Sequence, residues 1–381
     1  MACTNKGTVA YSHFIMGASV TARYPCGYAR VVSGEQVVRS VDRDWEGVRL
    51  HVVTGKGGTG KTTVAAALAL ALATGGRRTL FIECEGRQGL ARLFDSAPLP
   101  YAEHRVAAAP DGGIVYALAI DPEEALLEYL DMYYHLGRAG RALRRLGAID
   151  FATTIAPGVR DVLLTGKAYE ATRRRGTTKT SRTADTARLD EAADGFVYDA
   201  VVMDAPPTGR IARFLNVNSE VASLARVGPI NRQAESIMRL IRSPQTVVHI
   251  VTVLEEMPVQ ETLDGIEELH SFDLPVGGVI VNRVHEPLLP AGALKAAAAG
   301  TLDAATLTRG LKAAGVPVND AITAALMTEA GEHARQLAIE RRLRTRLRAA
   351  DRPLYDLADL DTTDVGRLYA LAAALIAQGA A

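Results

Sequence analysis

A glycine-rich segment with two lysines and several threonines is the clearest chemical feature of the sequence. Residues 55–63 read GKGGTGKTT, and residues 55–62 match the phosphate-loop pattern G-x-x-x-x-G-K-[ST]. Backbone N–H groups can converge on a triphosphate only where side chains do not block the approach, which explains the glycines. In such a loop Lys61 reaches the β and γ phosphates and the Thr62 hydroxyl binds Mg²⁺. The pattern predicts that a nucleotide is bound by Gly55, Gly57, Gly58, Thr59, Gly60, Lys61, Thr62 and Thr63.

A carboxylate ends a second apolar run, where residues 200–204 read AVVMD. Mg²⁺ keeps several waters and is held by few protein oxygens, so one carboxylate at a strand end beside a phosphate loop suits it. Thr62 and Asp204 are therefore the expected Mg²⁺ ligands. In the alternative interpretation, Asp204 only caps the turn that follows it.

These side chains need a sheet to position them, and the sequence predicts one. Short, nearly continuous apolar runs alternate with helical stretches, as expected for parallel strands that are buried on both faces. The runs lie at residues 50–53, 79–82, 114–120, 200–203, 247–253 and 277–281. This order predicts an α/β fold, a doubly wound and mostly parallel sheet of the P-loop NTPase type with an inserted helical subdomain. Ligands bind beyond the carboxyl ends of such strands, where both motifs lie.

The chain divides into an extension and one large domain. Residues 1–47 show no clear periodicity and no secretory signal, so we expect a flexible N-terminal extension, with Met16 as an alternative start. Residues 48–381 are the expected P-loop domain. A helical excursion at residues 121–195 begins with Asp121 as a cap and Pro122 at the first helical position. Residues 173–195 are polar and indicate a surface insertion or a disordered loop.

Composition argues against several classes of function. Lys+Arg and Asp+Glu both total 43, so the net charge is zero and no global basic field indicates nucleic acid. Cys3, Cys26 and Cys84 form no C-x-x-C pair and no plausible disulfide framework, which fits a reducing cytoplasm. No apolar run reaches the roughly 18 residues that cross a bilayer. We therefore expect a soluble cytoplasmic protein.

Two segments resemble the arsenite-pump (ArsA-type) ATPase family, which includes the tail-anchored-protein targeting ATPase. The phosphate loop has a second lysine, Lys56, which an ordinary loop does not require and which resembles the deviant loop of a dimeric ATPase class. Residues 204–209 resemble the family's nucleotide switch, with Ala205 where threonine is usual and Arg210 next, where histidine is usual. The resemblance covers residues 48–378 in outline. It implies ATP as the nucleotide, Mg²⁺ as the metal ion and hydrolysis as the reaction.

The resemblance also assigns catalytic roles. In the family the extra lysine reaches across the dimer, so Lys56 would add positive charge to the transferring phosphoryl group, as Lys61 does within its own chain. The alternative is a solvent-exposed loop lysine. Glu85 aligns with the aspartate that orients the attacking water, and a carboxylate can accept a hydrogen bond from that water. Glu83 is the competing residue, and a slow or silent site is the other alternative.

Two further residues are assigned to the nucleotide through the resemblance. Asn282 aligns with the asparagine that reads the adenine edge, for which an amide offers an acceptor and two donors. A helix or turn cap is the alternative for Asn282. Glu255 aligns with the acid that contacts the nucleotide across the dimer, and Glu256 competes for this role. Residues 351–354 lie where an adenine-side loop is expected.

Several family features are missing. Without a C-x-x-C pair the zinc clasp of the tail-anchored-targeting dimers cannot form, and the widely spaced cysteines offer no obvious arsenite site. The excursion contains Met132 but no methionine-rich stretch for a flexible client groove. An arginine-rich stretch at residues 335–348 is interpreted as a solvated helix face rather than a nucleic-acid patch. The last helix, expected at residues 368–378, lacks a basic face for membrane anchoring.

Two functions from different classes are consistent with these features. The first is a Mg²⁺-dependent, ATP-hydrolysing dimeric switch that couples its nucleotide state to an unknown protein cargo or membrane partner. The second is a nucleotide-gated scaffold with little turnover, like partition or division-site ATPases or one half of a paralogous heterodimer. A metalloid-stimulated pump subunit is a third option that needs clustered thiols. The second subunit is expected to be an identical copy or a paralogue, and neither nucleic acid nor zinc is expected.

Overall fold

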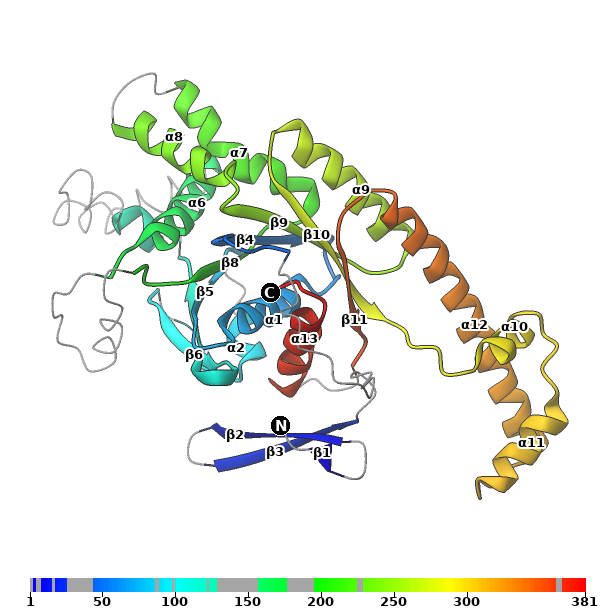
Figure 1. Cartoon of the computed structure of the whole chain (residues 1–381). Coiled ribbons are helices and arrows are strands. Elements are labelled where there is room, and N and C mark those ends of the chain that lie inside the picture. Colours follow the sequence, from blue (N-terminus) through cyan, green and yellow to red (C-terminus); the bar gives the residue numbers. More distant parts are fainter. Residues whose placement is uncertain are drawn as a thin grey trace, which may run out of the picture.

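The computed structural model describes most of the chain around one large sheet. The described residues are 3–4, 8–15, 18–25, 44–85, 89–97, 99, 101–121, 123–128, 157–176, 195–224, 229–360 and 365–381. The sheet has eight strands in the order β11-β10-β9-β4-β8-β5-β7-β6, with helices on both faces (Figure 1). They are β4 (Leu50–Gly55), β5 (Arg78–Glu83), β6 (His104–Ala108), β7 (Ile114–Ala119), β8 (Ala200–Asp204), β9 (Thr246–Thr252), β10 (Val276–Val284) and β11 (Leu354–Ala358). All neighbours except β6 and β7 pair in parallel, which confirms the predicted doubly wound, mostly parallel sheet.

The predicted apolar runs correspond to β4, β5, β7, β8, β9 and β10. The apolar runs of these strands are nearly continuous because both faces of each strand are buried. In β4, for example, Val52 belongs to the core on one face and Val53 to the core on the other. The sequence did not predict β6 and β11, which form the two edges of the sheet. Both edge strands alternate or expose their side chains and therefore lack a long apolar run.

Helices cover the two faces unequally. The first face carries α1 (Lys61–Ala73) and α13 (Val365–Ala377), and the second carries α6 (Pro157–Arg173), α7 (Thr208–Leu224), α8 (Pro229–Ile241) and α9 (Glu256–Ser271). Every residue of α1 from Val64 to Ala73 is buried, because alanine and leucine line all of its sides. This burial fixes the N-terminus of α1 and with it the phosphate loop. The short α2 (Gly89–Leu93) and a 3₁₀ helix at Pro110–Gly112 lie in the connections between β5 and β7.

An arm of three helices is inserted between β10 and β11. It consists of α10 (Ala291–Ala298), α11 (Ala304–Ala313) and α12 (Asp320–Arg348), and it stands out from the sheet in Figure 1. The C-terminal part of α12 joins the main core through Leu343 and Leu347. Further out, a small separate cluster joins α10 to α12 through Leu294, Ala297, Ala334 and Leu337.

The N-terminal residues form a small antiparallel sheet of β1 (Cys3–Thr4), β2 (Thr8–Ile15) and β3 (Ala18–Pro25). The flexible extension at residues 1–47, the domain boundary after it and the bounds of the helical excursion stay predictions. Within the excursion, Asp121 acts as the predicted cap, because its carboxylate accepts hydrogen bonds of 2.9 and 3.0 Å from the N–H groups of Glu123 and Glu124. Met132 and residues 177–194 of the polar stretch lie outside the described residues. Across the described ranges, no helix is long and apolar enough to cross a membrane.

Candidate nucleotide site

The phosphate loop joins the carboxyl end of β4 to the N-terminus of α1. Gly55, Gly58 and Gly60 have φ angles of 152°, 89° and 88°, which residues with side chains rarely adopt. A Cβ atom at Gly55 would lie 2.1 Å from the carbonyl oxygen of Val251, and one at Gly60 would lie 2.4 Å from Nδ2 of Asn282. The glycines therefore allow the loop to fold tightly against β9 and β10.

The outer side of the loop is open. A Cβ atom at Gly57 or Gly58 would meet no atom within 4 Å. The N-cap residue Gly60 has no side chain that could cap the first turn of α1, and that turn contains no acidic residue. The uncapped N–H groups and the partial positive charge of the helix N-terminus suit a bound anion. The surroundings of the loop therefore fit a phosphate group.

Thr62 and Asp204 lie together beside this loop. The Thr62 hydroxyl donates a 2.7 Å hydrogen bond to Oδ2 of Asp204. Oδ1 of Asp204 is buried and has no hydrogen-bond partner among the described residues. Burial raises the pKa of Asp204 to about 6, although the hydrogen bond from Thr62 and the charge of Lys61 lower it. The Thr62 hydroxyl and the Asp204 carboxylate, which has one oxygen without a partner among the described residues, form a ligand set that fits Mg²⁺.

Two more carboxylates lie at the end of β5. Glu83 is opposite Asp204 in the parallel register, and its Oε1 accepts a 2.9 Å hydrogen bond from the N–H of Gly89. Glu85 follows in the next loop and is less buried than Glu83. Burial has the largest effect on the pKa of Asp204. The negative charges of Glu83 and Glu85 raise this pKa further. The backbone holds one oxygen of Glu83, and the choice between Glu83 and Glu85 for positioning water stays a prediction.

The two lysines of the loop have different surroundings. Lys56 forms an ion pair with Glu261 of α9, which the sequence did not predict. The backbone carbonyl of Lys56 accepts a 2.8 Å hydrogen bond from the Thr59 hydroxyl. Lys61 is the first residue of α1, on the side of the loop where its charge acts on Asp204. Lys56 is therefore paired with α9, whereas the charge of Lys61 acts on Asp204.

Asn282 is buried on β10 and contacts the loop directly. Its Nδ2 donates a 2.8 Å hydrogen bond to the carbonyl of Thr59, whereas its Oδ1 has no partner in the described part of the chain. Glu255 is the N-cap residue of α9 and is exposed. Its competitor Glu256 forms ion pairs with arginines of α12. The structure thus brings Asn282 to the phosphate loop and leaves Glu255 at the surface.

Contacts that sequence reasoning missed connect α6 to the site. Arg160 of α6 donates a 2.9 Å hydrogen bond to the carbonyl of Cys84, directly after β5. Asp161 of the same helix pairs with Arg210 at 3.7 Å, at the start of α7. Helix α6 therefore contacts the segments that follow β5 and β8. Only the opposite charges of Asp161 and Arg210 could have indicated this pairing in the sequence.

The arginine-rich stretch of α12 binds carboxylates of the same chain. Arg342 and Arg346 pair with Glu256 of α9, and Arg344 pairs with Asp356 of β11. These ion pairs join the arm to the main domain. The interpretation of residues 335–348 as a helix face that does not bind nucleic acid stays a prediction.

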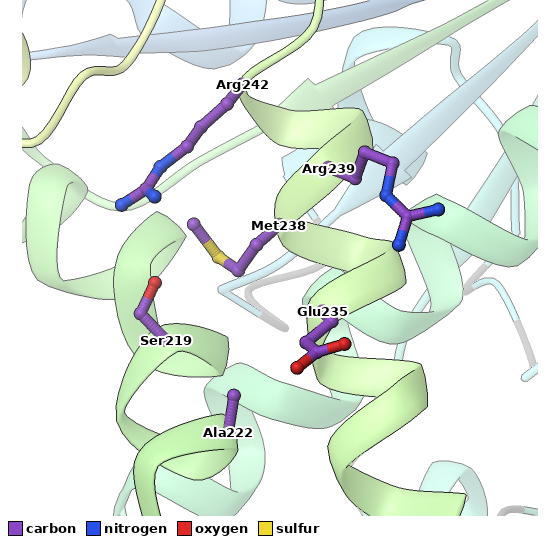
Figure 2. A pocket seen from close by; sticks show the side chains of 6 residues that line it. All are labelled: Ser219, Ala222, Glu235, Met238, Arg239 and Arg242. Carbon is purple, nitrogen blue, oxygen red and sulfur yellow. The ribbon is translucent and has the colours of Figure 1, made fainter.

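A separate hollow of about 640 Å³ opens between α7 and α8, as Figure 2 shows. It is lined by Ser219, Ala222, Glu235, Met238, Arg239 and Arg242. None of these residues belongs to the predicted nucleotide site. The hollow therefore lies on the helices that follow the switch-like segment, away from the phosphate loop.

Comparison with known proteins agrees with this geometry. Residues 48–245 match the family model of the anion-transporting ATPases. The ATPase BagA of Mycobacterium tuberculosis is 53% identical over 334 residues, which are 87% of this chain and 94% of that protein. The ATPase GET3 of Kluyveromyces lactis is 25% identical over 266 residues, 61% of this chain and 71% of that protein. The arsenical pump-driving ATPase of Acidiphilium multivorum is 25% identical over 246 residues, 61% of this chain and 38% of that protein.

The matches confirm the family resemblance that the phosphate loop and residues 204–209 indicated. They also agree with the sheet order and with the position of the loop between β4 and α1. The chain belongs to the anion-transporting ATPase family.

Proposed function

We propose that the chain hydrolyses ATP with Mg²⁺ and acts as a dimeric switch. One observation carries the proposal: Thr62 at the start of α1 contacts Asp204 at the end of β8, and a buried carboxylate oxygen has no partner among the described residues. This arrangement lies beside an open, uncapped helix N-terminus, where a triphosphate can bind. Metal ion and phosphate would therefore share one site.

Residues around this contact would hold the nucleotide. The N–H groups of the loop and Lys61 would bind the β and γ phosphates, and Thr62 and Asp204 would hold Mg²⁺. Bound Mg²⁺ neutralises charge on the phosphate oxygens. Asn282 would read adenine through the amide oxygen that has no partner among the described residues.

In the proposed reaction, a water oxygen forms a bond to the γ phosphorus while the bond to the β–γ bridging oxygen breaks. ADP leaves with the bridging oxygen, and the attacking water gives one proton to the solvent as inorganic phosphate forms. Glu85 would accept a hydrogen bond from this water and hold it in line. Lys56 would act on the nucleotide of the second subunit, and Glu255 would contact that nucleotide. The second subunit would be an identical copy or a paralogue.

Helix α6 supports coupling between the nucleotide and the helical excursion. Arg210 directly follows residues 204–209 and pairs with Asp161, while the neighbouring Arg160 binds the carbonyl of Cys84. Loss of the γ-phosphate would change both segments and thereby move α6. The excursion at residues 121–195 would then change its affinity for a protein cargo or a membrane partner. We propose that this cycle takes place in the cytoplasm.

Steady-state ATP turnover, measured against protein concentration, tests the proposal. In the wild type we expect turnover that rises more than linearly with concentration, because the active unit is a dimer. Lys56→Ala should abolish this turnover but retain ATP binding. Lys61→Ala should weaken ATP binding itself, measured by equilibrium dialysis. If Lys61→Ala binds ATP as tightly as the wild type, the proposal is wrong.

The Glu85 segment favours a second candidate, a nucleotide-gated scaffold with little turnover. Glutamate is one methylene longer than aspartate, so the water would need a different position from that in the family motif. Single-turnover measurements with labelled ATP separate the candidates, because phosphate release slower than nucleotide exchange would support the scaffold. Cys84 gives no support to a thiol-based metalloid site, since burial raises the pKa of its thiol well above the usual value.

A further inference from the structure

Lys56 and Glu261 form an ion pair within one chain, although the proposed function places Lys56 at the nucleotide of a second chain. The Lys56 ammonium donates to Oε1 of Glu261, and the two side chains are 32% and 35% exposed. The pair therefore lies at the surface, where a docking molecule can reach it. The Lys56 ammonium can contact a nucleotide on a second chain only after its ion pair with Glu261 opens.

Glu261 has a fixed position on α9. The next residue, Thr262, is buried and donates a 2.8 Å hydrogen bond to the carbonyl of Pro258. One turn further along, α9 packs closely on α7, because a Cβ atom at Gly265 would lie 3.4 Å from Cγ2 of Thr208. These contacts hold the helix that carries Glu261 against the segment that follows β8.

Helix α9 is also held by the arm. Glu256 pairs with Arg342 and Arg346 of α12, and Oε1 of Gln260 accepts a 2.6 Å hydrogen bond from Arg346. Contacts from α7 and from α12 therefore brace α9 on two sides. The main chain that carries Glu261 is thus held in place, and opening of the pair requires movement of the two side chains only.

Lys56 combines a fixed backbone with an adaptable side chain. The Thr59 hydroxyl holds its carbonyl, while the following Gly57 and Gly58 leave open space around the loop. The four-carbon stem of lysine lets the ammonium turn toward a new partner without movement of the main chain. The ammonium can therefore exchange the Glu261 carboxylate for a phosphate group of a nucleotide that is bound to another chain.

We propose that Glu261 is a positioning residue that holds Lys56 within its own chain until a second, nucleotide-loaded copy docks. This inference rests on the proposed dimeric ATPase. The carboxylate and the triphosphate are anions that compete for one ammonium, and the more highly charged triphosphate takes it in the assembled dimer. Glu261 thereby sets the protein concentration at which turnover begins.

Two of these ion pairs open when two identical copies assemble. A partly exposed pair is weak, so opening one changes an equilibrium by up to about five-fold. Two pairs together change the dissociation constant of the dimer by up to about thirty-fold. Removal of the Glu261 charge should therefore tighten the dimer by about two- to thirty-fold.

Sedimentation of the full chain with Mg²⁺ and ATPγS measures this effect in the wild type, Glu261→Gln and Glu267→Gln. Glutamine has nearly the shape of glutamate, and Glu267 is an exposed residue of the same helix, so the second variant is a matched control for charge. We expect a dimer that is at least about two-fold tighter for Glu261→Gln, and a change under about two-fold for Glu267→Gln. An unchanged or weaker dimer in Glu261→Gln, or equal tightening in both variants, would overturn the inference.

Turnover separates failure of this inference from failure of the proposed function. If the wild type does not hydrolyse ATP, the proposed function is wrong. If Lys56→Ala hydrolyses ATP like the wild type, ATP hydrolysis stands, but the roles of Lys56 and Glu261 are both wrong. If Lys56→Ala is inactive but Glu261→Gln reaches half-maximal turnover at the wild-type protein concentration, only the role of Glu261 is wrong. A lower half-maximal concentration without loss of maximal rate supports the role. A lower maximal rate would show that Glu261 acts in the assembled dimer, and would overturn it.

Discussion

The central sheet carries two groups of buried polar residues, and they differ in how they handle charge. The first group lies beside the phosphate loop, where Asp204, Glu83 and Thr62 place carboxylates next to a hydroxyl. The second lies on β4 and β9, where the rings of His51 and His249 stack with centroids 5.4 Å apart. Nδ1 of His51 lies 3.2 Å from Nε2 of His249. The first group concentrates charge, and the second pairs two imidazoles.

The histidine pair belongs to a closed cluster. Trp45 meets His249 edge-on at 5.3 Å, and its Nε1 donates a 2.9 Å hydrogen bond to the hydroxyl of Tyr355. That hydroxyl donates in turn to Asp44 at 2.6 Å. Burial lowers the pKa of both imidazoles, that of His51 to about 4, so both are neutral at pH 7.

The group beside the phosphate loop has the features of a candidate binding site, and the histidine group has those of a packing cluster. At Asp204 a buried oxygen without a protein partner among the described residues is costly for folding, and a bound ligand would compensate for it. In the histidine cluster, Nε2 of His51 and Nδ1 of His249 also have no hydrogen-bond partner among the described residues. Both rings are neutral, however, so their burial costs less than that of a charged carboxylate. We therefore expect changes in the first group to alter turnover and changes in the second to alter stability.

The largest expected effect is that of Asp204→Asn on turnover. We expect kcat to fall by at least about 100-fold, because the carboxylate proposed to hold Mg²⁺ is lost. The melting temperature should change little, because the replaced carboxylate is buried and one of its oxygens has no partner among the described residues. Asp199→Asn, at the amino end of the same strand, is the control and should retain turnover. Wild-type kcat in Asp204→Asn would contradict the division between the two groups.

Acid should destabilise the protein through the histidine cluster. The pKa of His51 is about 4 in the folded chain and 6.5 in the unfolded chain, so the unfolded chain binds this proton first. Stability from this residue is therefore present above pH 6.5 and is lost as the pH falls toward 4, by up to about 3 kcal/mol.

Chemical denaturation at pH 7 and pH 4.5 measures this loss, with His51→Gln as the comparison. The raised pKa of Asp204 acts with the opposite sign between pH 3.8 and 6, but it is common to both proteins and cancels in the difference. His51→Gln should lose less stability than the wild type on acidification. Equal losses would show that His51 does not titrate as an isolated buried imidazole.

A smaller effect is expected from Tyr355→Phe. The change removes the hydroxyl that joins Trp45 to Asp44, and we expect a loss of about 1 kcal/mol of unfolding free energy. ATP affinity should not change, because the hydroxyl belongs to the packing cluster. Paired denaturation and ATP-binding curves test this expectation. Weakened ATP binding by the folded variant would show that the histidine cluster also affects the nucleotide site, and would contradict the division between the two groups.

The smallest effect on stability is expected from Asp161→Asn, which breaks a 3.7 Å pair with the exposed Arg210. We expect under about 0.5 kcal/mol in unfolding free energy. The ATP-dependent change in hydrogen exchange along α6 should nevertheless decrease, because this pair joins α6 to the segment after β8. If the ATP-dependent change in hydrogen exchange along α6 is the same in Asp161→Asn as in the wild type, this pair does not couple α6 to the nucleotide site.

The parts of the fold that were predictable share a local cause. Strands such as β4 and β8 are mostly apolar because helices cover both of their faces, and that pattern is visible in a short sequence window. The edge strands β6 and β11 are stabilised by one neighbour and by partial burial, so their sequences resemble loops. The same limit explains why Leu354, assigned to an adenine-side loop region, begins a strand.

The sequence by itself determined the phosphate loop and the carboxylate at the end of β8, because both depend on residue types at short, fixed spacings. It also indicated the family, since the second lysine lies within the same short segment. Only the tertiary structure decided the partner of Lys56, because Glu261 is 205 residues away and its helix position depends on contacts with α7 and the arm. It likewise decided that His51 and His249 pair, because neighbouring strands bring together residues 198 positions apart, and burial then keeps both rings neutral.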